Sequence, residues 1–192
     1  MNSAPPLTDL EWREFLRAYS CEYLNSDDLR RATEEGRSSV TDVQRETGWL
    51  GGGPAGEAAV LAAERRLGIR LPPSYRNFLL VSDGWGVIAD SLAELLAVGR
   101  IGWFRDLEPE LLASWSMPDM DHFAEHSEML ERALLISGPA DGDYWLLSPD
   151  DIAGNDEWTA YWWMAGDGQD PEPYDDFAAL VVRARENFLA RG

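Results

Sequence analysis

The segment from Ala63 to Gly86, AERRLGIRLPPSYRNFLLVSDGWG, restricts the fold more than any other part of the chain. Gly68 stands where a left-handed residue would end a helix, and Pro72-Pro73 suits a first helical turn, which needs no amide donor. An apolar stripe at helical spacing follows at Tyr75, Phe78 and Leu79. Asp83-Gly84 favours a turn at its end. The segment therefore predicts two short helices that supply core residues and carry no catalytic group.

Helical patterns also precede this segment. Residues Thr8 to Glu11 match a capping box, so we expect a helix from there to about Leu24. A weaker helix is expected from Ser26, before a polar connection across residues 34–48. The helix that leads into Gly68 is expected to begin near Pro54.

After the central segment the periodicity changes. Residues 87–118 are mixed, with a helix-like run SLAELLAV (91–98) and a strand-like run RIGWF (100–104), and a helix is expected over Asp119–Arg132. Three short aromatic-rich runs separated by Gly, Asp and Pro then predict antiparallel strands. These runs are ALLISG (133–138), DYWLLS (143–148) and EWTAYWWM (157–164).

In the last run large apolar side chains alternate on both faces, so that strand should be covered on both sides. A helix over Asp175–Arg191 closes the chain. Helices, then strands, then a helix predict an α+β fold.

The composition indicates one domain with additional length at its N-terminus. Hydrophobic residues make up 45% of the 192 residues, which allows a sizeable core. We expect an N-terminal helical extension over residues 1–45 and a main domain over residues 46–192. The first residues lack the pattern of a signal peptide, no apolar run could span a membrane, and Cys21 is the single cysteine. A cytoplasmic protein without an internal disulfide is expected.

The negative charge is large and unevenly distributed. A net charge of −19 disfavours nucleic acid and anionic membranes as partners and favours a basic partner. Residues 133–182 contain no Arg, Lys or His but hold eleven acidic residues. Two interpretations remain open, a solvated acidic side and a docking surface for a cationic partner.

Aromatic residues lie beside these acids in the sequence, as anchors do in many protein interfaces. The candidate partner-binding residues are Asp141, Asp143, Asp150, Asp151, Asp156, Glu157, Trp158, Trp162 and Asp167.

Motifs that could carry catalysis are weak. The run HFAEH, from His122 to His126, matches an inverted zinc-peptidase pattern with Glu125 as base, but a third ligand is not indicated, and an exposed helix face is the favoured interpretation. The run GGGPAG (51–56) matches a dinucleotide-binding pattern without the strand that must precede it. Cys21 has no histidine nearby in the sequence. We therefore expect no enzyme activity, no cofactor and no metal.

Several blocks of the sequence together resemble the SMI1/KNR4 family, the SUKH superfamily. They are Trp49, Gly51, GPAGE (53–57), Glu64, Leu67-Gly68, Leu71-Pro72-Pro73, Tyr75, Phe78-Leu79, Gly84-Trp85, ALLIS (133–137), YWLLSP (144–149), NDEWTAYWW (155–163) and PYDDF (173–177). Asp83 stands where the family usually has asparagine. The resemblance covers roughly residues 47–189 and leaves the N-terminal extension outside.

The resemblance implies an α+β domain with a central, mostly antiparallel sheet and helices packed against it. It also implies a bacterial immunity protein, which binds and neutralises a cognate toxin, often a nuclease, and it supplies no catalytic residues. Fungal relatives suggest the alternative of a regulatory or scaffold module that binds other proteins.

Overall fold

The computed structural model describes residues 7–89, 92–115, 124–138, 142–152 and 154–191. In chain order the elements are α1 (Asp9–Leu24), α2 (Asp27–Glu34), α3 (Asp42–Thr47), α4 (Glu57–Leu67), α5 (Pro73–Val81), β1 (Trp85–Ala89), β2 (Leu92–Leu95), β3 (Gly102–Trp103), α6 (Phe104–Leu107), α7 (Pro109–Trp115), α8 (Ala124–Arg132), β4 (Leu134–Leu135), β5 (Asp143–Ile152), the 3-10 helix η2 (Gly154–Asp156), β6 (Trp158–Met164), the 3-10 helix η3 (Ala165–Asp167), β7 (Glu172–Tyr174) and α9 (Phe177–Arg191).

The strands form a five-stranded sheet and a separate hairpin. The sheet has the order β3-β4-β5-β6-β7, with antiparallel pairing between each described pair of neighbours. Strands β1 and β2 form the antiparallel hairpin. The predicted α+β fold with a mostly antiparallel central sheet is confirmed.

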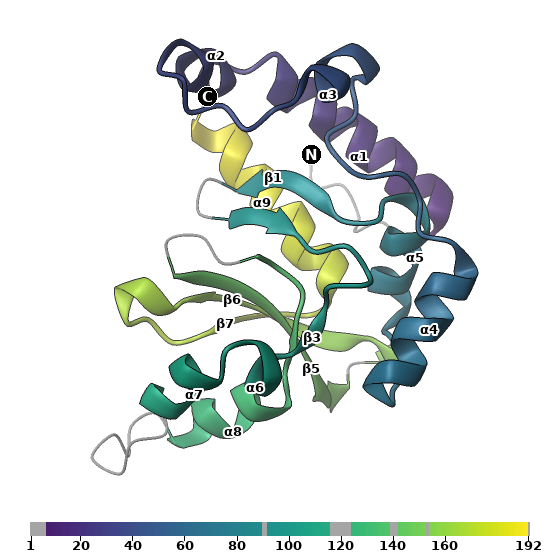
Figure 1. The fold of residues 1–192 in the computed structure, drawn as a ribbon, viewed down its shortest axis with the longest axis vertical. Coiled ribbons are helices and arrows are strands. Elements are labelled where there is room, and N and C mark those ends of the chain that lie inside the picture. The colour runs from purple at the N-terminus through teal and green to yellow at the C-terminus, as the bar shows by residue number, and fades with distance from the viewer. Residues whose placement is uncertain (1–6, 90–91, 116–123, 139–141, 153, 192) are drawn as a thin grey trace.

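Both faces of the sheet are covered by helices (Figure 1). Along β5, Trp145 and Leu147 belong to the larger core, which also includes residues of α1, α4, α5 and α9. Their neighbours Tyr144 and Leu146 point to the opposite face and join a smaller core with residues of α6 and α8. The prediction that large apolar side chains cover both faces of the 157–164 strand is confirmed, because Trp162 belongs to the larger core and Trp163 to the smaller one.

The end of helix α4 and the start of helix α5 lie where the glycine and proline residues of the sequence predict them. Gly68 has a φ of 74° and ends α4, and Pro73 opens α5. The stripe residues Tyr75, Phe78 and Leu79 are fully buried. Helix α4 begins at Glu57, three residues after the predicted start at Pro54, because the residue before it, Gly56, has extended backbone angles.

Gly84 occupies a position where a side chain does not fit. Its φ is 84°, and an added Cβ would lie 2.8 Å from the carbonyl oxygen of Leu95 and 3.0 Å from the amide nitrogen of Ala97. We expect Gly84→Ala to lower the free energy of unfolding by about 1–3 kcal/mol, measured by chemical denaturation. The control Gly99→Ala adds a methyl group with no atom within 4 Å. It should change stability by less than about 0.5 kcal/mol, and an equal effect of the two variants would contradict the prediction.

The predicted helix over residues 91–98 is wrong, because Leu92–Leu95 form strand β2. The backbone here bonds to segments distant in the sequence: β2 pairs with β1, and the amide of Leu96 donates to the carbonyl of Ile136 at 2.8 Å. Leu95 is 1% exposed, so burial in the tertiary structure outweighs the local helical pattern.

The other differences concern short elements. The polar connection contains α3, which begins with a second capping box formed by Thr41 and Gln44. Helices α6 and α7 and strand β7 are also additions to the predicted set. The helix expected over 119–132 is described from Ala124 onward, and its first residues lie outside the described ranges.

The N-terminal helix α1 contributes directly to the larger core. Trp12 is fully buried, and its indole Nε1 donates a hydrogen bond to the carbonyl oxygen of Ser74 on α5 at 3.0 Å. Phe15, Leu16 and Tyr19 on the same face are at most 9% exposed. Helix α1 therefore covers α5 with an apolar face and leaves its opposite face to solvent.

Candidate functional site

The candidate partner-binding residues lie at two opposite ends of the β5–β6 pair. Asp143 pairs with Met164 at one end, and Ile152 pairs with Trp158 at the other. At the usual rise of a strand, Asp143 and Asp150 are separated by roughly 20 Å. The residues that are close in the sequence therefore do not form one patch.

At the η3 end, two of the candidates are internal. Asp143 is 7% exposed and Trp162 is 8% exposed, and the indole Nε1 of Trp162 donates to Asp143 Oδ2 at 3.4 Å. Asp167 is exposed in η3. Asp141 lies outside the described residues.

At the β5–β6 connection, two candidates present exposed carboxylates. Asp150 lies 3.1 Å from Arg132 Nη1 and remains about half exposed. Asp156 is exposed in η2. Asn155 and Asp156 both have left-handed backbone angles, with φ values of 65° and 61° respectively. Two consecutive non-glycine residues in this region store backbone strain that the surrounding contacts must hold. Asp151 belongs to strand β5.

Glu157 provides the contact that holds this connection. Its carboxylate accepts hydrogen bonds from the backbone N–H and the hydroxyl of Ser74, both at 2.8 Å. Ser74 lies in the first turn of α5, so the carboxylate satisfies an amide that has no partner within the helix. Burial raises the pKa of Glu157, opposed by the Ser74 hydrogen bonds and reinforced by the charge of Asp176. Glu157 thus acts as a structural anchor between β6 and α5.

A groove adjoins this anchored connection on the side of α4 and α5. It has a volume of about 730 Å³, and its walls include Leu61, Arg70, Asn77, Asp156 and Trp158. Trp158 is 6% exposed, so it contributes to the groove wall while packing in the core. We call this the α4–α5 groove. It is the place where the structure brings two sequence-predicted residues, Asp156 and Trp158, to one cavity.

The charges inside the α4–α5 groove are partly paired. Arg76 lies between Glu57 and Glu64, with its Nε 3.6 Å from Glu64 Oε1. Glu64 also accepts from the amide of Leu71 at 3.1 Å. Asp156 also lines the groove. Asp175 is exposed directly after β7, which pairs with β6 so that Tyr174 lies opposite Ala160.

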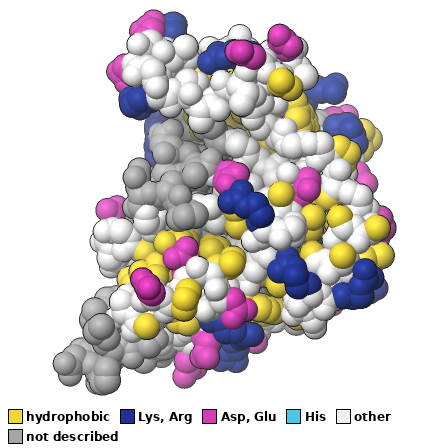
Figure 2. Space-filling view, in the orientation of Figure 1, with side chains coloured by type: hydrophobic (Ala, Val, Ile, Leu, Met, Phe, Trp, Pro, Cys, Tyr) yellow, Lys and Arg dark blue, Asp and Glu magenta, His cyan; other side chains and the backbone are white. Residues whose placement is uncertain are grey.

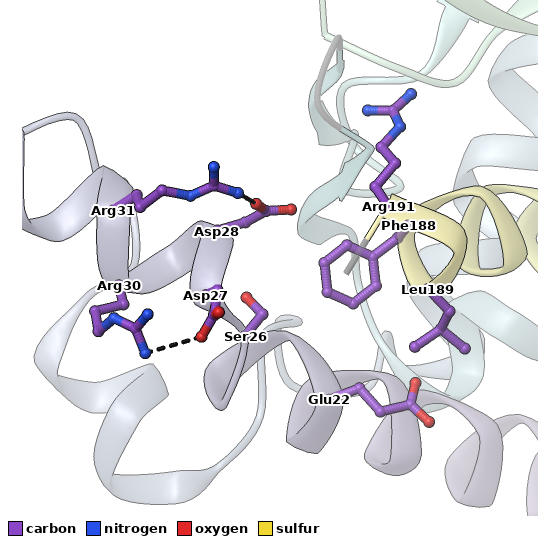
Figure 3. A pocket seen from close by; sticks show the side chains of 9 residues that line it. All are labelled: Glu22, Ser26, Asp27, Asp28, Arg30, Arg31, Phe188, Leu189 and Arg191. Atoms are coloured by element: carbon purple, nitrogen blue, oxygen red, sulfur yellow. Dashed lines mark hydrogen bonds and ion pairs between the residues drawn. The ribbon is translucent and has the colours of Figure 1, made fainter.

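A second groove lies between α2 and the end of α9 and has a volume of about 620 Å³ (Figure 3). Arg30 and Arg31 each form an ion pair with an aspartate of the same helix, Asp27 and Asp28. Phe188 and Leu189 form its apolar wall. Its charges are balanced locally, so the groove does not favour a ligand of either sign.

A third groove, which we call the α1–α3 groove, lies between α1, α3 and the glycine-rich loop of residues 51–53. Arg13 and Arg17 of α1 line it. The sequence interpretation did not single out these arginines. Their spacing of four residues on one helix, in a chain with 35 acidic and 16 basic residues, was the available signal.

Acidic side chains do not cover the molecule uniformly. On the face shown in Figure 2, basic and acidic side chains are interspersed, with hydrophobic atoms exposed between them. In the sequence, the excess of negative charge is greatest in residues 133–182.

The structure describes part of the HFAEH run and all of the GGGPAG run. His126 lies 3.0 Å from Asp170, measured from Nε2 to Oδ1, and His122 lies outside the described ranges. Among the residues that the structure describes, no three or more His, Cys, Asp or Glu gather closely enough to hold a metal ion. The glycines 51 and 52 follow α3 rather than a strand, and an added Cβ on either would collide with residues 82–85.

The described helices include none with both the length and the apolar character needed to cross a membrane.

The comparisons with known proteins agree with this architecture. A comparison with curated proteins gave no significant match. The family model of the SMI1 / KNR4 family (SUKH-1) matches residues 54–183, which is more than half of the chain. The match runs from the residues before α4 into α9, and it includes the buried stripe of α5 and the strands of the large sheet. The chain therefore belongs to the SMI1/KNR4 family (SUKH-1).

Proposed function

We propose that this protein is an immunity protein of the cytoplasm that binds a cognate toxin, most simply a nuclease, and neutralises it by occupying its active cleft. Membership of the SMI1/KNR4 family supports a protein partner. The hallmark residues of the family, such as Tyr75 and Phe78, are buried core residues, which supports action by binding rather than by catalysis.

The observation that carries the proposal is a set of exposed carboxylates at the end of the sheet where Asp156 and Trp158 line the α4–α5 groove. Asp150, Asp156 and Asp175 are exposed at the same end of the sheet, and the chain segment that supplies them holds no basic residue. A nuclease must bind phosphates, so its cleft is cationic. Carboxylates at this end of the sheet would attract the cationic cleft of the toxin at long range. At short range, the groove lined by Trp158 would receive a side chain of the toxin.

Charge reversal of these three carboxylates tests the proposal. We expect the triple variant Asp150→Lys, Asp156→Lys and Asp175→Lys to associate with the toxin more slowly by roughly tenfold or more, with a weaker dependence on salt, because steering is lost. The measurement is the association rate between purified protein and the toxin encoded by the adjacent gene, with protection of toxin-expressing cells as a second readout.

The matched control changes the charge by the same amount elsewhere. Glu14, Glu34 and Glu46 are exposed on α1, α2 and α3, and their replacement by lysine should leave the association rate close to that of the wild type. Equal slowing of both triple variants would contradict a localised binding face. A stable complex with a protein of the host cell, together with no rescue from any toxin, would favour the regulatory module instead.

A further inference from the structure

We propose that the α1–α3 groove binds a short acidic segment of a partner protein. The groove has a volume of about 410 Å³, within the range of sites that take small ligands or short segments. The residues that matter for recognition are Arg13, Arg17, Val43, Trp49 and Pro54. The groove is built by the N-terminal helices together with the residues where the family match begins, and it does not depend on the proposed toxin.

The first argument is charge. The chain has 35 acidic and 16 basic residues, yet none of the described residues that line this groove is acidic. Arg13 and Arg17 are exposed and form no ion pair within the described part of the chain. Residues four apart on a helix lie on the same face, so Arg13 and Arg17 present two positive charges to the groove together. The arginines of the α2–α9 groove, by contrast, are neutralised by their own helix.

The second argument is exposed apolar surface beside these arginines. Val43, on the α3 wall, is 66% exposed. Leu10 is 65% exposed and precedes Arg13 by one helical turn, so the two share a face of α1. An apolar side chain of a bound segment could cover this surface while its carboxylates pair with the arginines.

The third argument is that the groove is held in place before any ligand binds. Gln44 Nε2 donates to the carbonyl of Leu50 at 2.7 Å, which ties α3 to the loop. Trp49 Nε1 donates to the carbonyl of Gly52 at 2.9 Å, and its ring packs edge-on against Trp85. A Cβ on Gly52 would lie 2.6 Å from the carbonyl oxygen of Asp83, so the loop lies directly against the end of α5. A preformed wall reduces the entropy lost on binding.

The chemistry of the groove favours carboxylates on a peptide over phosphates on a nucleic acid. Guanidinium groups bind both through paired hydrogen bonds. A nucleic acid would bring many phosphates near a protein of charge −19, which repels them beyond the groove. A short segment with two or three carboxylates and one apolar residue has the complementary pattern.

The test uses the full-length protein and a fluorescein-labelled acidic peptide, Glu-Asp-Leu-Glu-Asp-Leu, with fluorescence anisotropy as the readout. We expect the wild type to bind this peptide and the double variant Arg13→Glu and Arg17→Glu to bind it roughly tenfold to a hundredfold more weakly, because charge-assisted hydrogen bonds are lost. The indole signal of Trp49 in the NMR spectrum should shift when the peptide is added.

Matched controls separate this site from general electrostatics. Arg37 and Arg65 are also exposed and line none of the three grooves described above, so Arg37→Glu with Arg65→Glu makes the same change of charge elsewhere. This control should retain the affinity of the wild type. Val43→Glu tests the opposite wall without altering α1 and should also weaken binding.

Three outcomes would overturn the proposal. The first is no binding of the acidic peptide by the wild type at about 1 mM, the weakest range of specific affinity. The second is an equal loss of peptide affinity in the Arg37 and Arg65 control. The third is equally strong competition by a single-stranded oligonucleotide, which would indicate a general anion site. None of these results would alter toxin binding at the α4–α5 groove, so the two proposals fail independently.

Discussion

Replacing Trp12 by alanine is expected to lower the free energy of unfolding by about 3–5 kcal/mol, a large part of the stability of a typical domain. The Trp12 ring is fully buried, and its centroid lies 5.4 Å from that of Phe78 and 5.6 Å from that of Phe177. The variant would leave a cavity between α1, α5 and α9 and would remove the hydrogen bond to Ser74. A residue that precedes the family match would thus stabilise the core of the matched region.

Chemical denaturation followed by circular dichroism provides the measurement. Leu10→Ala is the control on the same helix, because Leu10 is 65% exposed, and it should change the free energy of unfolding by less than about 0.5 kcal/mol. We expect one cooperative transition in which α1 unfolds with the sheet. A loss below about 1 kcal/mol for Trp12→Ala, or a separate transition for α1, would contradict the packing described here.

The second large effect is expected at Glu157. Glu157→Ala should lower the free energy of unfolding by about 2–3 kcal/mol, because the amide and hydroxyl of Ser74 would remain buried without their acceptor. Glu157→Gln keeps an oxygen that can accept one of these bonds, so its loss should be smaller. An equal loss of stability in both variants would show that this anchor does not depend on an oxygen that accepts the Ser74 hydrogen bonds.

The pH dependence of stability, compared between the wild type and Glu157→Gln, gives an independent test. Burial raises the pKa of Glu157 above its usual value of 4.5, so the folded protein holds this proton more tightly than the unfolded chain does. The contribution of Glu157 to stability is therefore greatest below the usual pKa and decreases as pH rises through the raised pKa. Glutamine does not titrate, so the stability of wild type relative to Glu157→Gln should fall as pH rises above 4.5. A difference that is constant or grows with pH would contradict the raised pKa.

Local sequence signals located most of the long elements. The capping box at Thr8 and the glycine at position 68 fix helix ends through backbone hydrogen bonds and φ values that are satisfied within a few residues. The aromatic runs became β5 and β6 because their side chains suit a strand covered on both faces. The helix predicted over residues 91–98 was wrong, because the backbone of this segment forms hydrogen bonds with distant segments. These are strand β1 and Ile136, the residue after β4.

At the candidate site, the properties set by the sequence and those set by the tertiary structure can also be separated. The sequence alone determined the excess of negative charge, its concentration after Arg132 and the family pattern, since these depend on residue identity and order. Only the tertiary structure decided which acidic residues face solvent. Glu157 became a buried cap because β6 packs against the start of α5, whereas its neighbour Asp156 remained exposed at the rim of a groove. The burial of a carboxylate depends on which distant segment packs against it, and that information lies in contacts between residues more than eighty positions apart.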